Sequence, residues 1–128
     1  MADKPIQIHQ HFEPLPGDLT KSIYTVPRGK RLLIEQVATY VCVPKGSGFL
    51  VYLTTTLGGT TARWYIPTAF QTTYNAGASD AQYGQQSMRV YADPGTSVGF
   101  EIHRNNSVSN AGIEAEISVA GVLIGPRV

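Results

Sequence analysis

The sequence predicts an all-β protein, an antiparallel β-sandwich of about eight strands for which a jelly roll is the expected topology. Three observations support this fold class. Apolar and polar residues alternate with a period of two, proline and glycine interrupt the alternation at short intervals, and no segment shows a capped helical period. The 128 residues suffice for one core. We therefore expect a single domain over 1–128, with 1–20 as an N-terminal arm or edge strand.

The predicted strands are rich in β-branched and aromatic residues, which suit a pleated, half-buried surface. The segment 31–43 is apolar enough to be a central strand that is buried on both faces for much of its length. In order along the chain, the predicted strands cover residues 5–12, 22–26, 31–43, 49–56, 61–66, 87–91, 97–104 and 113–124.

Two of the connections carry clear turn chemistry. VPRGK at 26–30 contains a proline and a glycine at positions that suit a type I turn. ADPGT at 92–96 places Pro94 and Gly95 at the two central positions of a type II turn, where glycine adopts positive φ at little cost. Both turns separate predicted strands and therefore support the strand assignment.

The charge balance excludes a surface built to bind nucleic acid. Lysine and arginine number 10 and aspartate and glutamate 9, so no excess of positive charge is available for phosphates. No apolar run reaches the length of a membrane span and no signal peptide is visible at the start, so a cytoplasmic location is the default expectation. Charged residues make up only 15%, a thinly charged surface that favours a homo-oligomer.

Two of the three histidines stand close together in IHQHFE, residues 8–13. On a strand, His9, His11 and Glu13 would face one side, with the two imidazoles about 6.6 Å apart along the chain. Two histidines at this spacing can bind one transition metal ion, but a third ligand must come from elsewhere, and His103 is the remaining histidine. The alternative is a polar row that faces solvent on an edge strand, with no cofactor.

The pair His9-x-His11 resembles the first metal-binding motif of the cupins, which are jelly-roll proteins. The resemblance covers about ten residues and implies a metal-dependent enzyme whose last ligand is a further histidine. The sequence departs from the motif because Glu13 follows the pair too soon, no glycine precedes it, and Gly17 comes early. These departures put the metal site in doubt.

The segment NAGASDAQYGQQ, residues 75–86, has little strand character and is long for a simple connection. Amides beside an aromatic ring suit sugars, because the ring covers an apolar sugar face and the amides bond hydroxyl groups. Tyr65 joins this set because it lies on the wet face of strand 61–66, whereas Trp64 alternates with Ile66 and is expected in the core. The candidate ligand-binding residues are Tyr65, Asn75, Asp80, Gln82, Tyr83 and Gln85. A flexible connector is the alternative interpretation.

Three functional hypotheses follow. The first is a non-catalytic, oligomeric binding module that presents loops to a carbohydrate or a protein. The second is a structural subunit of a multimeric particle, for which the apolar end GVLIGPRV at 121–128 would pair in a sheet or lie at an interface. The third is a cupin-like metal-dependent enzyme. An enzyme is the less expected outcome because no nucleophile motif or phosphate loop is present.

Overall fold

The computed structural model describes residues 3–15, 18–44, 46, 48–74, 79–106 and 113–125. Within these ranges no helix is long and apolar enough to cross a membrane. The described residues form nine strands: β1 (Lys4–Leu15), β2 (Leu19–Thr25), β3 (Arg31–Pro44), β4 (Gly48–Leu57), β5 (Thr60–Tyr65), β6 (Ala69–Tyr74), β7 (Ser79–Ala92), β8 (Ser97–Asn106) and β9 (Ile113–Ile124).

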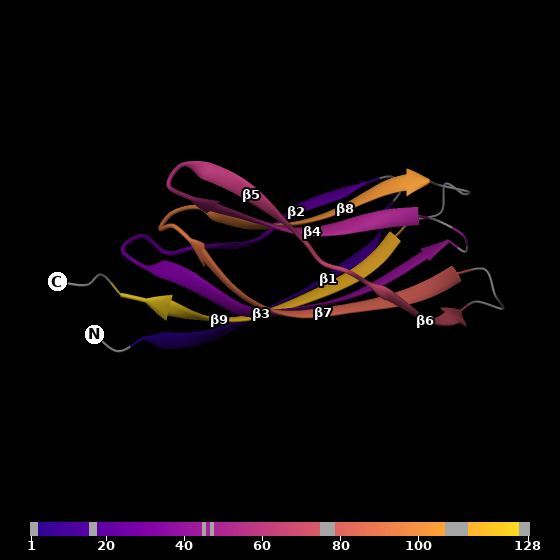
Figure 1. The fold of residues 1–128 in the computed structure, drawn as a ribbon, viewed down its shortest axis with the longest axis horizontal. Coiled ribbons are helices and arrows are strands. Elements are labelled where there is room, and N and C mark those ends of the chain that lie inside the picture. The colour runs from indigo at the N-terminus through magenta and orange to yellow at the C-terminus, as the bar shows by residue number, and fades with distance from the viewer. Residues whose placement is uncertain are drawn as a thin grey trace.

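The nine strands form two antiparallel sheets that pack as a β-sandwich, which confirms the predicted fold class at this level. One sheet has five strands in the order β1-β9-β3-β7-β6, and the other has four in the order β2-β8-β4-β5. Figure 1 shows the two layers, with the start of β1 beside the end of β9. The strand β1 lies at one edge of the five-stranded sheet.

The core lies between the sheets, and alternate residues of the interior strands, such as β3, β8 and β9, form most of it. The strand β9 alternates regularly between buried and partly exposed residues along most of its length, as expected for an interior strand with one face on the core. Phe100 of β8 is fully buried and stacks on Phe12 of β1, with 6.1 Å between the ring centroids. This contact joins the edge strand β1 to the opposite sheet.

The strands β5 and β6 are edge strands of different sheets, and the chain passes directly from one to the other (Figure 1). Residues 66–68 connect them and pass from the four-stranded to the five-stranded sheet. The Ile66 N–H donates to the carbonyl of Val51 on β4, and Thr68 Oγ1 donates to Gln82 Oε1 of β7 at 2.8 Å. This crossing segment therefore contacts both layers and fixes the position of β7 beside it.

The turn at 93–96 forms as predicted. The Thr96 N–H donates to the carbonyl of Asp93 at 3.2 Å, and Gly95 has a φ of 77°. A positive φ at the third residue is the mark of a type II turn. The Asp93 carboxylate also accepts a hydrogen bond from the Gly58 N–H at 2.7 Å, which links this turn to the β4–β5 hairpin.

Two expectations were wrong in this region of the chain. Residues 79–86 are not part of a loop, because β7 begins at Ser79 and pairs with β3 along its length. Trp64 is not a core residue, since 40% of it is exposed. It lies on the same sheet face as the buried Leu53, but β5 is an edge strand and has a neighbouring strand, β4, on one side only among the described residues. Its Nε1–H donates to Thr55 Oγ1 at 2.9 Å.

Candidate functional site

The outer face of the five-stranded sheet brings together polar and aromatic residues from four strands. The pairing registers align residues that are far apart in the chain into rows across this face. Two neighbouring rows cross the sheet, the first with His9, Ser118, Ala38 and Gln85 and the second with His11, Glu116, Tyr40 and Tyr83.

Small side chains at the centre of these rows leave a depression, which we call the outer groove. It consists of two adjoining cavities of about 350 and 100 Å³ that share Ala38 and Ser118 in their lining. The larger cavity extends towards His9 and Gln36, and the smaller one towards Tyr83. The groove thus runs over β1, β9 and β3 and ends against a ring of β7.

Two tyrosines form the aromatic end of the outer groove. The ring centroids of Tyr40 and Tyr83 lie 5.3 Å apart, and the ring planes are inclined by 57°. Tyr83 is 55% exposed, whereas Tyr40 is partly buried. A ring that is held by a neighbour and still half-exposed is pre-positioned for stacking, because little side-chain freedom remains to be lost on binding.

Polar side chains line the end of the groove that lies over β1, where the larger cavity contains Gln7, His9 and Gln36. His9 Nδ1 and Ser118 Oγ are hydrogen-bonded at 2.8 Å. His11 Nδ1–H donates to Glu116 Oε1 at 3.1 Å, and its Nε2 lies 3.5 Å from Glu13 and 3.6 Å from Glu114. The polar side chains of the lining offer both donors and acceptors, as a polyhydroxylated ligand requires, whereas His11 lies on the same sheet face but lines neither cavity.

The structure divides the predicted ligand-binding residues into separate groups. Tyr83 and Gln85 lie on the outer face of the five-stranded sheet. Gln82 accepts the hydrogen bond from Thr68, and Asp80 accepts one from the Gly46 N–H at 3.3 Å, so both serve the local structure. Tyr65 lies on the four-stranded sheet and is 50% exposed, as expected for its wet face. Asn75 lies outside the described residues.

A second polar cluster occupies the outer face of the four-stranded sheet. His103 Nε2–H donates to Glu101 at 2.7 Å, and its Nδ1 lies 3.2 Å from an Asp18 carboxylate oxygen. The Arg63 guanidinium contacts the same Glu101 carboxylate at 3.1 Å, and the Tyr52 ring lies edge-on to the imidazole, 5.8 Å between centroids. Both imidazole nitrogens therefore face carboxylates, and neither is placed to accept a proton from a substrate.

The three histidines do not form one metal site. His9 and His11 lie on β1 of the five-stranded sheet, whereas His103 lies on the outer face of the other layer. Among the described residues of one chain, no group of three or more histidine, cysteine, aspartate or glutamate side chains could hold a metal ion. His103 is therefore not the third ligand that the histidine pair required.

The second cluster makes a testable pH prediction. The hydrogen bond to Glu101, and the one to Asp18, raise the pKa of His103 above its ordinary 6.5. A histidine whose pKa is higher in the folded state than in the unfolded state stabilises the fold while it is protonated. This stabilisation is fully present below the pKa of the unfolded state, and it is lost as pH rises through the pKa of the folded state. We expect the difference in stability between the wild type and His103→Gln to shrink as pH rises from about 5.5 to about 8.5. Urea denaturation midpoints measure this difference.

His9→Gln is the matched control because His9 contacts neither Asp18 nor Glu101. This variant should keep the pH dependence of the wild type. A difference between the wild type and His103→Gln that does not vary with pH would contradict the assignment.

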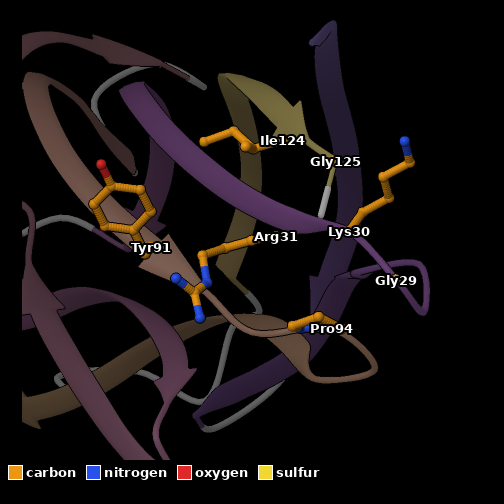
Figure 2. A pocket seen from close by; sticks show the side chains of 7 residues that line it. All are labelled: Gly29, Lys30, Arg31, Tyr91, Pro94, Ile124 and Gly125. Atoms are coloured by element: carbon orange, nitrogen blue, oxygen red, sulfur yellow. The ribbon is translucent and has the colours of Figure 1, made fainter. Parts of the chain in front are cut away.

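A larger cavity, of about 520 Å³, lies at the end of the sandwich near the 26–30 and 93–96 turns. Figure 2 shows Arg31 and Tyr91 on one side of it, and Lys30 extending away from both. The Arg31 guanidinium is paired with Asp93 at 3.3 Å, and the Tyr91 hydroxyl accepts a hydrogen bond from Arg89 at 3.1 Å. Most of its polar side chains are thus already engaged, so the outer groove is the stronger candidate.

Several groove residues were missed by sequence reasoning, namely Ala38, Tyr40, Glu116 and Ser118. Each stands at an outward position of a correctly predicted strand, and this alternation was the available signal. No protein-family model matches the chain, and no curated protein is significantly similar to it. The function must therefore be inferred from the geometry.

Proposed function

We propose that the protein is a non-catalytic carbohydrate-binding module whose binding surface is the outer groove. The observation that carries this proposal is the half-exposed Tyr83 ring, braced by Tyr40, at one end of a depression lined by hydrogen-bonding side chains. A sugar ring has an apolar face that suits stacking and hydroxyl groups that need donors and acceptors.

The dimensions of the groove favour a short oligosaccharide over a compact ligand. The depression is open and crosses three strands, so successive sugar units can lie along it from Tyr83 towards His9. Ser118, in the lining of both cavities, is placed to contact a central unit. The site is built on strands instead of loops, and therefore changes little in shape on binding.

The strand order supports a jelly-roll topology for this module. Counting β5 and β6 as one strand that changes sheet, the orders β1-β9-β3-β7 and β2-β8-β4-β5 interleave consecutive strands between the layers. Such interleaving is expected of two Greek keys wound together. Because jelly rolls carry many functions, the topology supports the fold proposal and adds no weight to the choice of ligand.

A glycan array followed by calorimetry tests the proposed function. We expect the wild type to bind a defined subset of glycans, and Tyr83→Ala to weaken binding of the best glycan by about tenfold or more, because the stacking surface is lost. Tyr65→Ala is the matched control, since it removes a similarly exposed tyrosine from the other sheet. Absence of glycan binding, or equal losses in both variants, would refute the proposal.

A further inference from the structure

The strand β1 presents an unpaired backbone edge among the described residues. It pairs with β9 on one side, and no described strand pairs with its other side. Pro5, which has no N–H, lies opposite Val122, so the backbone groups of residue 5 point away from β9. By alternation, the backbone N–H and C=O groups of Gln7, His9 and His11 point away from β9 as well.

The side chains of His9 and His11 are oriented as metal ligands usually are. Each has its Nδ1 fixed by a neighbour on β9, Ser118 for His9 and Glu116 for His11. Fixing Nδ1 sets the ring orientation and leaves Nε2 for a metal. His9 Nε2 has no partner among the described residues, and the two contacts of His11 Nε2 exceed ordinary hydrogen-bond lengths.

One chain alone provides an incomplete site. Two imidazoles supply half of the four ligands that a tetrahedral zinc ion takes in a closed site. The described part of the chain holds no group of three that could complete it, and His103 lies on the other layer. The missing ligands must then come from a second molecule that approaches the free side of β1.

A second copy can supply these ligands through backbone pairing. If two β1 strands pair antiparallel about a two-fold axis at Gln10, His9 of one copy lies opposite His11 of the other. The residues that pair would be those whose backbone groups already point outward, so ordinary ladder hydrogen bonds can form from Gln7 to Glu13. Directly opposed residues in such pairs have Cα atoms about 5.5 Å apart, which brings the four imidazoles onto one face.

We propose that two copies of this protein pair through β1 and share one zinc ion, which His9 and His11 of both copies bind. The carboxylates of Glu13, Glu114 and Glu116 surround His11 and provide negative charge beside the cation. The same contact supplies hydrogen-bond partners for the unpaired backbone edge of β1 and the two missing ligands for the histidine pair. This inference does not rest on the proposed carbohydrate function, and its test uses no glycan.

The test measures zinc stoichiometry and molecular mass together, on protein without a histidine tag. Zinc chloride should bind at one ion per two chains, by calorimetry, and light scattering should show twice the 13.8 kDa chain mass at saturation. His9→Ala and His11→Ala should each lose most of this binding and of the zinc-dependent dimer. His103→Ala is the control and should behave as the wild type, because it is remote from β1.

A second pair of variants tests the edge without changing the histidines. Gln7→Pro removes an outward-pointing N–H that the pairing needs, whereas Gln7→Ala keeps it. We expect Gln7→Pro to weaken zinc-dependent dimerisation by about tenfold and Gln7→Ala to leave it unchanged. The proposal is overturned if zinc does not bind, if zinc binds one per chain to a monomer, if binding survives His9→Ala, or if Gln7→Pro dimerises as well as Gln7→Ala.

Discussion

Replacing Phe100 with alanine is expected to lower the free energy of unfolding by about 3 to 5 kcal/mol. Phe100 is the largest of the fully buried side chains, so its loss removes apolar contact and leaves a cavity that neighbouring strands cannot readily close. The effect should extend to β1, because the Phe100 ring stacks on Phe12 and this contact joins β1 to the opposite sheet.

Urea denaturation, followed by the fluorescence of the single tryptophan, measures this change. Phe70→Ala is the matched control, since it deletes the same side chain from a site that is 58% exposed. It should change the free energy of unfolding by less than about 0.5 kcal/mol. Similar losses for the two variants would show that the core is not centred on Phe100.

The interior strands could be predicted because their pattern of apolar and polar residues follows the burial of each position. In β9, alternate residues face the core and the outer surface, and the sequence shows this alternation from Ile113 to Val119. The same holds for β3, which pairs on both sides and is apolar for most of its length. Where a strand is buried by partners on both edges, local composition and tertiary environment agree.

The strands at the side of the sandwich formed by β5 and β6 were harder to predict. The strand β6 and the first half of β7 are rich in alanine, glycine, threonine and glutamine, and this composition resembles a loop. β7 is a strand because it pairs with β3, and β6 is a strand because the chain, after the crossing segment 66–68, pairs with β7. Trp64 shows the same limit. Its side chain lies on the predicted face of the strand, but its burial depends on how far the edge strand β5 extends beyond the opposite sheet.

The candidate site depends on register, which the sequence does not reveal. The sequence suggests Tyr83 and Gln85 as loop residues for their chemistry, and pairing of β7 with β3 places both on the outer face of the sheet, where Tyr83 lines the outer groove. His9 reached the other end of the same groove through pairing of β1 with β9. A shift of one residue in either ladder would turn these side chains to the opposite face.

The crossing segment links this register to the stability of the fold. Gly84 follows Tyr83 in β7 and faces the interior, where the carbonyl oxygen of Pro67 and side-chain atoms of Thr68 and Ile66 pack against it. A Cβ at position 84 would overlap the Pro67 carbonyl, which is backbone and cannot move aside cheaply. Glycine is therefore required here for close approach of two backbones and not for an unusual φ.

Gly84→Ala is accordingly expected to destabilise the protein by about 1 to 3 kcal/mol, the usual cost of overpacking a well-packed site. The crossing segment would have to separate from β7, and the strain would act beside Tyr83. The loss is measured as a lower urea midpoint, and glycan affinity should fall with it if the outer groove is the binding site. Gln85→Ala, on the exposed face, should cost less than about 0.5 kcal/mol. A Gly84→Ala protein as stable as Gln85→Ala would mean that 66–68 does not fix the position of β7.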